Sequence, residues 1–212
     1  MVSMRLMRSR IRSRASICGM AAGWDEEEER LEIRARQMTK CLAVEAALSR
    51  LGQVHLVGSA ALHVMVARDI DLVVVVSQLD VETLRVIARL AAQLMVRREV
   101  HAVTVRDETG RWNTDPDYPD GVYLFIECAD EAGEVWTLDV WFVDEPERKP
   151  ALQHVGRIGP CIDPASQAAI LAIKRATGGR RPDGTRLPSI EIYEAVVDDG
   201  IRTPEEFAQR AR

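Results

Sequence analysis

The chain has 212 residues, of which 47% are hydrophobic and 29% are charged. This length and composition allow a domain with a buried core and exclude a chain that is disordered throughout. The net charge is −5 at pH 7, so the protein as a whole has no positive field that attracts nucleic acid or an acidic membrane. Any such partner must contact a local basic patch.

The cysteines and the apolar runs exclude further classes of protein. No apolar run reaches about 18 residues, so we expect a cytoplasmic protein with no membrane-spanning segment and no membrane partner. The cysteines lie far apart and have no histidine at zinc-ligand spacing. This spacing indicates neither a disulfide framework nor a structural zinc site and fits a reducing cytoplasm: Cys18, Cys41, Cys128 and Cys161.

Residues 1–23 differ from the rest of the chain. They contain five arginines, no acidic residue and no apolar segment long enough for a secretory signal. We interpret them as a basic N-terminal arm. Two explanations stay open: a flexible or wrongly assigned start with Met20 as the true initiator, or an arm that touches RNA.

The next part of the sequence predicts alternating helices and strands. Residues 25–29 are acidic, and apolar residues at helical spacing follow them up to Gly52. This pattern predicts one long helix whose first turn carries acids that complement the helix dipole. Residues 54–57 form an apolar run typical of a strand, which Gly58-Ser59 interrupts before a short predicted helix at 60–67.

Further strands are expected to complete the core. Residues 69–76 begin with alternating polarity and become uniformly apolar, which is typical of a central strand with an exposed polar end. The runs at 122–128 and 135–143 are joined by a short polar segment, which indicates an antiparallel hairpin. A helix at 79–97, a strand at 99–106 and a loop at 107–120 lie between them. The expected fold is α/β (α+β), with a mixed sheet.

The last part of the chain is expected to be helical after a loop at 144–161. Asp163 predicts the N-cap of a helix that ends at Thr177. A second helix is expected at 188–199, and a third starts with a capping box at Thr203. The predicted organisation is an arm at 1–23, a core at 24–160 and a small C-terminal helical lobe at 161–212.

Three aspartates suggest a metal site. Asp69 and Asp71 are two residues apart on the predicted strand, so their side chains lie on one face, about 7 Å apart along the chain. Asp139 lies on a later strand that we expect beside the first. Mg²⁺ and Mn²⁺ prefer carboxylate oxygens, with waters and substrate phosphates as further ligands. We therefore predict that these three residues are catalytic and hold one or two divalent ions.

Gly58 and Ser59 are candidate nucleotide-binding residues. Glycine leaves room for a phosphate to approach the backbone, and the serine hydroxyl precedes a predicted helix. A purely structural explanation also exists, in which Gly58 makes a plain turn and the aspartates cap strands or form salt bridges. Three acids between buried apolar residues are unfavourable, however, unless they are paired or liganded.

The order of these motifs resembles the signature of the polymerase-β-type nucleotidyltransferase superfamily. That signature is a hydrophobic residue with Gly-Ser, here 57–59, then nine residues, then Asp-hydrophobic-Asp-hydrophobic, here 69–72, and a third acid, here Asp139. The resemblance spans about residues 54–143. It implies a nucleotidyltransferase sheet flanked by helices. It also implies a metal-dependent enzyme that moves NMP from an NTP to a hydroxyl acceptor and releases pyrophosphate.

Basic residues offer further candidate contacts. Arg68 precedes the acids and either forms a surface ion pair or contacts the nucleotide. A basic cluster in the second half of the chain is either solvated charge at helix ends or a surface for phosphates and RNA: Lys174, Arg175, Arg180, Arg181 and Arg186.

The segment around Lys174 is similar to AbiEii-type toxin nucleotidyltransferases, including the mycobacterial ones. The likeness implies that Lys174 binds the NTP phosphates, that a tRNA 3′ end is the acceptor and that the following arginines hold it. It also implies a bacterial toxin with a cognate antitoxin as partner. Glu191 or Glu194 stands where that family has aspartate.

Two alternatives remain open. The same segment resembles antibiotic nucleotidyltransferases of the aminoglycoside and lincosamide type, whose acceptor is a small hydroxylated drug. In that case acidic residues of the long loop would contribute to the cleft: Asp115, Asp117 and Asp120. The other alternative is a catalytically inactive nucleotide-binding module of the same fold.

Overall fold

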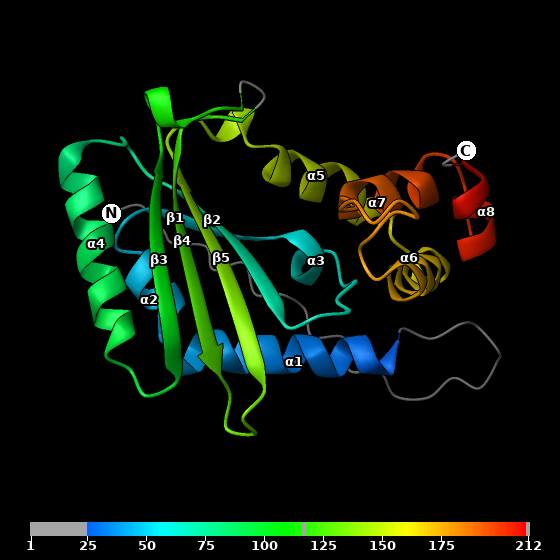
Figure 1. The fold of residues 1–212 in the computed structure, drawn as a ribbon, viewed down its shortest axis with the longest axis horizontal. Coiled ribbons are helices and arrows are strands. Elements are labelled where there is room, and N and C mark those ends of the chain that lie inside the picture. The colour runs from blue at the N-terminus through cyan, green and yellow to red at the C-terminus, as the bar shows by residue number, and fades with distance from the viewer. Residues whose placement is uncertain (1–24, 116–117, 211–212) are drawn as a thin grey trace, which may run out of the picture.

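The computed structural model describes residues 25–115 and 118–210. The predicted basic arm at 1–23 lies outside these ranges, as does Asp117. A five-stranded sheet in the order β1-β2-β5-β4-β3 forms the centre of the molecule (Figure 1). Its strands are β1 (Gln53–Val57), β2 (Asp69–Val75), β3 (Val100–Glu108), β4 (Gly121–Ala129) and β5 (Val135–Val143).

The sheet is mixed, as the sequence predicts. Strands β2 and β5 run parallel, whereas β1 with β2, β4 with β5 and β3 with β4 are antiparallel. The predicted hairpin is therefore confirmed as β4 and β5. Because the parallel pair places β2 beside β5, residues more than sixty positions apart become neighbours, including Asp71 and Asp139.

One face of the sheet is closed by helices. Helices α1 (Glu26–Cys41), α2 (Val44–Leu48) and α4 (Val81–Met95) share one hydrophobic cluster with alternate residues of β2, β4 and β5. Helix α4 shows why these elements form. Its N-cap Asp80 accepts a hydrogen bond from the Thr83 amide at 2.8 Å, and its buried residues recur at helical spacing.

Two helical predictions in this region are wrong. The long helix up to Gly52 is divided into α1 and α2, because Ala43 adopts a left-handed conformation with φ of 51°. The bend lets residues on both sides of it enter the same core cluster. The predicted helix at 60–67 is only α3 (Gly58–Ala61), and after it His63 has φ of 58° and Val64 is fully buried.

The loop predicted at 144–161 contains a helix. Helix α5 (Pro150–Ile158) begins with a proline in its first turn, where the missing amide is tolerated, and short 3₁₀ turns at Pro146–Arg148 and Gly159–Cys161 flank it. Its apolar side packs on the face of the sheet opposite α1, where Leu152 and Val155 meet Val73 and Trp141.

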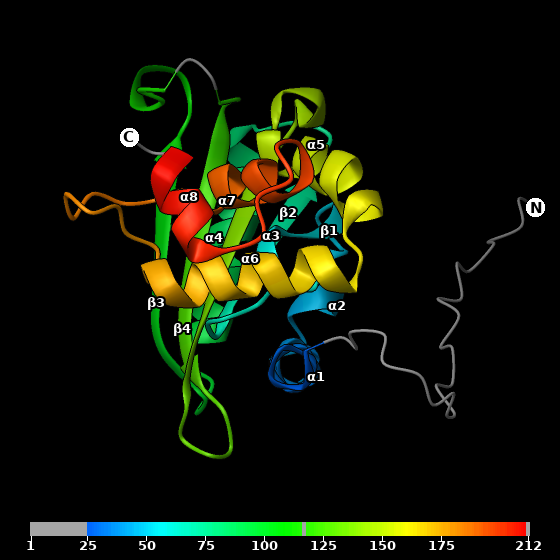
Figure 2. The ribbon, with the colours of Figure 1, turned by 90° about the vertical axis from the view of Figure 1, so that its right-hand side faces the viewer.

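The predicted C-terminal helices are present as α6 (Pro164–Thr177), α7 (Ser189–Val197) and α8 (Pro204–Arg210). Figure 2 shows them grouped in front of the sheet. They form a second cluster with Leu62 and Val64, so the segment after α3 is held against them. The division into a core and a lobe stays a prediction. None of the helices in the two described ranges is long and apolar enough to cross a membrane.

Candidate active site

Three carboxylates meet on the face of the sheet opposite α1. The parallel register pairs Asp71 with Asp139, and Asp69 precedes Asp71 by two residues on the same face. One carboxylate oxygen from each residue lies within 4.8 Å of the others. The structure therefore brings together the three aspartates that the sequence singles out, and their role as metal ligands stays a prediction.

The electrostatics of this group favour a cation. Burial, together with the negative charges of Asp69 and Asp139, raises the pKa of Asp71 to about 7. Burial also raises the pKa of Asp69, against the effect of a hydrogen bond from Thr137. Carboxylates that are partly buried and close together resist ionisation unless positive charge compensates them. A bound divalent cation would supply that charge, so these residues fit one.

Two hydroxyl groups orient the carboxylates. The Thr137 hydroxyl donates to Asp69 Oδ1 at 2.6 Å, and the Tyr123 hydroxyl donates to Asp139 Oδ1. Burial and the nearby Asp139 raise the pKa of Tyr123, so it remains a proton donor at neutral pH. The sequence does not single out either residue. Strand periodicity could have indicated them, because the side chains of Thr137 and Tyr123 point to the same face of the sheet as Asp139.

Gly58 lies against the same group. Its φ is +62°, and a Cβ built there would lie 2.0 Å from Asp71 Oδ2. A side chain at this position would therefore displace the Asp71 carboxylate, in addition to the strain of a left-handed backbone. Ser59 follows it in the first turn of α3. The structure thus places the Gly-Ser pair directly beside the carboxylates.

Lys174 reaches the site from α6. Its ammonium group donates to the Val64 carbonyl at 2.8 Å and to the Tyr193 hydroxyl at 3.4 Å. Burial lowers the pKa of Lys174 to about 8, and the charges of Asp71 and Asp69 act in the opposite direction. The lysine therefore adds positive charge near the carboxylates while it holds the segment after α3.

The predicted arginines have different surroundings. Arg186 lies near enough to the carboxylates for its charge to lower the pKa of Asp69 and Asp71. Arg68 forms an ion pair with Glu134 at 2.7 Å, which is the first of its two predicted alternatives. The other three are engaged elsewhere: Arg175 with Asp25 and Glu27, Arg180 with the Gly184 carbonyl, and Arg181 with Glu191.

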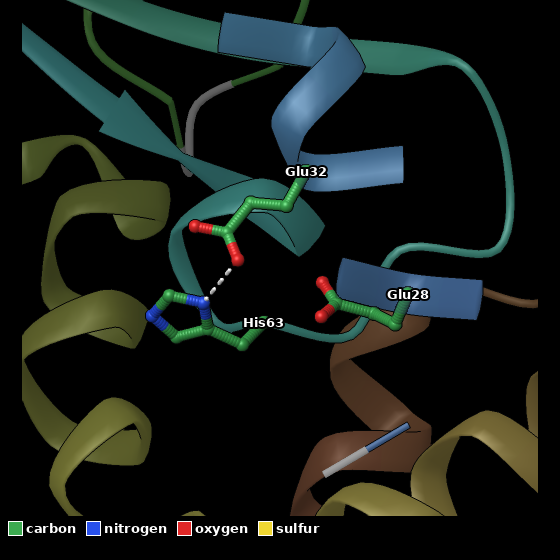
Figure 3. A group of neighbouring side chains, drawn as sticks. All are labelled: Glu28, Glu32 and His63. Atoms are coloured by element: carbon green, nitrogen blue, oxygen red, sulfur yellow. Dashed lines mark hydrogen bonds and ion pairs between the residues drawn. The ribbon is translucent and has the colours of Figure 1, made fainter. Parts of the chain in front are cut away.

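A second polar group, formed by Glu28, Glu32 and His63, lies between α1 and the segment after α3 (Figure 3). His63 Nδ1 lies 3.1 Å from Glu32 Oε2, and the carbonyl of His63 accepts a hydrogen bond from Gln167 at 2.6 Å. Glu28 is 2% exposed and accepts from the Met65 amide at 3.4 Å. These contacts connect α1, α6 and the segment that leads into β2, so they position the strand that carries Asp69 and Asp71.

Comparisons with known proteins show the fold. No family model and no curated protein matches the sequence. Among solved structures, the chain is similar to Cid1 in complex with the UTP analogue UMPNPP and to a cytoplasmic RNA terminal U-transferase. Each likeness has a TM-score of 0.50 and 12% sequence identity and covers 82% of this chain. The chain has the nucleotidyltransferase fold.

The likeness has a limited extent. The match covers 49% of each of those two chains, so this protein spans about half the length of the nucleotidyltransferase structures that it resembles. A third similar structure is the Cid1 poly(U) polymerase bound to MgATP, at 12% identity. Sequence identity at this level shows the nucleotidyltransferase fold alone, so the chemistry must be inferred from the residues of the site.

Proposed function

We propose that this protein is a nucleotidyltransferase that moves NMP from an NTP to a hydroxyl acceptor. The observation that carries the proposal is the meeting of Asp69, Asp71 and Asp139 directly beside Gly58. The carboxylates would hold Mg²⁺ or Mn²⁺, and the glycine leaves open backbone for the triphosphate. The metal ion and the backbone at Gly58 would thus bind the negatively charged triphosphate at one place.

The residues of the chain have distinct roles in this reaction. A divalent ion, when bound, lowers the pKa of the acceptor hydroxyl and neutralises charge on the α-phosphoryl group. Thr137 and Tyr123 orient two of the carboxylates through their hydroxyl groups. Lys174 and Arg186 add positive charge on the side of the C-terminal helices, where they would face the NTP phosphates.

The reaction balances with these groups alone. The acceptor oxygen forms a bond to the α-phosphorus, the bond from that phosphorus to the pyrophosphate oxygen breaks, and the hydroxyl proton passes to water or to a carboxylate. The protein's contribution is to align the two substrates and to stabilise the charge that develops. Gly58 and Ser59 would hold the leaving pyrophosphate. A nucleotide contact by Arg68 has less support, because Arg68 is paired with Glu134.

We propose RNA as the acceptor. Similar structures include an RNA terminal U-transferase and the Cid1 poly(U) polymerase, whose names both concern RNA. A narrower form is a toxin-like enzyme that modifies a tRNA 3′ end and is blocked by a cognate antitoxin. That form rests on the likeness around Lys174, with acceptor contacts from Arg175, Arg180, Arg181 and Arg186.

The antibiotic alternative has less support from the site. In the long loop, the Asp120 carboxylate accepts hydrogen bonds from the Gly110 amide at 2.9 Å and from Asn113 at 3.0 Å. It therefore shapes the loop, whereas an acceptor site for a cationic drug needs acids that face the drug.

The test is a transfer assay with each α-labelled NTP in the presence of Mg²⁺ or Mn²⁺. The acceptors are total tRNA, single-stranded oligoribonucleotides, and a panel of aminoglycosides and lincosamides. We expect label on RNA, and none when Asp71→Asn replaces the wild type. Label on a drug alone would favour the antibiotic alternative. NTP binding without transfer to any acceptor would leave a nucleotide-binding module.

A further inference from the structure

One buried lysine on the site face of the sheet has no anionic partner among the residues that the structure describes. Lys149 precedes α5 and is 4% exposed. Its ammonium lies 3.8 Å from the centre of the Trp141 ring and 5.4 Å from that of Tyr118. Within residues 25–115 and 118–210 no acidic side chain forms an ion pair with it, and burial lowers its pKa to about 8. A buried ammonium without an anion is unfavourable unless a ligand supplies one.

This lysine is connected to the carboxylates through two aromatic rings. Trp141 follows Asp139 by two residues on β5, so it lies on the same face about 7 Å further along the strand. Tyr123 is the cross-strand partner of Trp141, with ring centroids 5.1 Å apart, and its hydroxyl donates to Asp139. The lysine is therefore adjacent to the group that includes the third carboxylate.

Lys149 lies over β5, at its Trp141 ring. Gly58 follows β1, which borders β2 on one side, whereas Asp139 lies on β5 at the other side of β2. Since the triphosphate is proposed at Gly58, the attacking hydroxyl must approach from the opposite side, in line with the leaving pyrophosphate. A hydroxyl on that path would pass Asp139 and then Trp141 and Lys149.

A second cation extends this surface. The Arg106 guanidinium lies 4.5 Å from the centre of the Tyr123 ring, and its side chain is exposed. Arg106 also forms an ion pair with Glu108 at 3.3 Å. Single-stranded RNA is commonly bound by cations that contact its phosphates and by aromatic rings on which its bases stack. Lys149 and Arg106, each over an aromatic ring near Asp139, have this arrangement. A polycationic drug would instead be repelled by Lys149.

We propose that Lys149 and Arg106 bind backbone phosphates of a single-stranded RNA acceptor whose 3′-hydroxyl lies at Asp139. This inference rests on the proposed function and names a surface on the acceptor side for it. In the described part of the chain no acid pairs with Lys149, whereas acids already neutralise Arg175 and Arg181. Lys149 is therefore the stronger candidate for a phosphate contact.

The chain offers a matched pair of variants. It contains three lysines, of which Lys40 lies exposed in the last turn of α1, a helix that packs on the other face of the sheet. Lys149→Met keeps an unbranched apolar side chain and removes the charge, and Lys40→Met makes the same change far from the site. Arg106→Gln is a second variant at the proposed RNA surface. Because the Arg106 side chain is exposed, we expect the protein to fold normally with this change.

The experiment measures binding of a fluorescently labelled single-stranded oligoribonucleotide with a free 3′-hydroxyl, by anisotropy over a range of salt concentrations. For Lys149→Met we expect an affinity about tenfold or more below wild type. The slope of log affinity against log salt should fall by about one, as for the loss of one phosphate contact. Arg106→Gln should change both quantities in the same direction, and Lys40→Met should change neither.

Steady-state transfer assays add the discriminating readout. Lys149→Met should raise the KM for RNA and leave the KM for the NTP unchanged. Wild-type affinity and salt slope in folded Lys149→Met and Arg106→Gln would overturn the inference, as would a rise in the NTP KM alone. Transfer to a drug with no RNA binding would overturn this inference and leave the transferase function standing. RNA binding that depends on Lys149 but is not followed by any transfer would support this inference and contradict the transferase function.

Discussion

The two faces of the central strands have opposite surroundings, although alternating residues of the same strands form both. On β5, Leu138 is fully buried in the cluster with α1 and α4, while Asp139 beside it belongs to the carboxylate group. On β2, Ile70 and Leu72 face that cluster, while Asp69 and Asp71 face the site. A difference of one position therefore decides whether a side chain serves stability or chemistry.

A pair of neighbouring substitutions gives the largest expected contrast. Asp139→Asn should lower kcat/KM about 10³-fold or more, because it removes a charge that the reaction requires. Leu138→Ala should lower the free energy of unfolding by about 2–5 kcal/mol, because it leaves a cavity in a closed core.

Transfer assays and chemical denaturation measure the two effects. Leu138→Ala should keep wild-type kcat/KM at a temperature where it is folded, and Asp139→Asn should keep wild-type stability or exceed it. A loss of activity in folded Leu138→Ala as large as that of Asp139→Asn would remove the distinction between the faces.

Gly58→Ala tests the close approach at the edge of the site. The new Cβ would lie 2.0 Å from Asp71 Oδ2, so we expect kcat to fall about a hundredfold and stability to fall by about 1–3 kcal/mol. Gly133→Ala is the control, because Gly133 has φ of +79° and no heavy atom within 4 Å of the built Cβ. It should lose stability through backbone strain and keep full activity. Equal activity in the two variants would exclude a need for open space at Gly58.

Tyr123→Phe removes the hydroxyl that donates to Asp139 and retains the ring beneath Arg106. Groups that orient ligating carboxylates typically contribute about tenfold to a hundredfold in metal affinity or activity. We expect a loss of activity near the lower end, compensated in part by raising the Mg²⁺ concentration. Tyr118→Phe should have no such Mg²⁺ dependence, and a titration of activity against Mg²⁺ compares the two.

The smallest expected effect concerns the polar group behind β2. Glu32 raises the pKa of His63 above 6.5, so protonated His63 stabilises the fold. That contribution is fully present below the unfolded pKa and is lost as pH rises through the folded pKa. Wild-type melting temperature should therefore decline slightly more between pH 6 and pH 8 than that of His63→Gln. Parallel melting curves across this range would exclude the contribution.

Periodicity predicted most of the sheet and the carboxylate group. The parity of Asp69 and Asp71 is a local property, and the uniformly apolar run after them indicates a central strand. The hairpin then fixes Asp139, because its Leu138 and Val140 neighbours alternate with it. These features need no knowledge of distant contacts, so the sequence was sufficient for them.

Features that depend on distant packing could not be predicted. Ala43 has no turn signature, and its left-handed conformation follows from the burial of Leu42 and Val44 on both sides of it. The sequence does not predict helix α5, because Pro150 and Gly156 are typical of loops. Its apolar side packs on Trp141, which comes from another element. The sequence does not predict the role of Lys149 either, since the rings around it, Trp141 and Tyr118, come from other segments of the chain.

The parallel pairing of β2 with β5 also determines when the site can exist during folding. Asp69 and Asp71 precede Asp139 by more than sixty residues, and α4, β3 and β4 separate them along the chain. Contacts between such distant segments form late, because a long loop must first be closed. A growing chain would therefore contain two of the three carboxylates long before the last one is in place. Partly folded molecules should be inactive, whatever helices they have already formed.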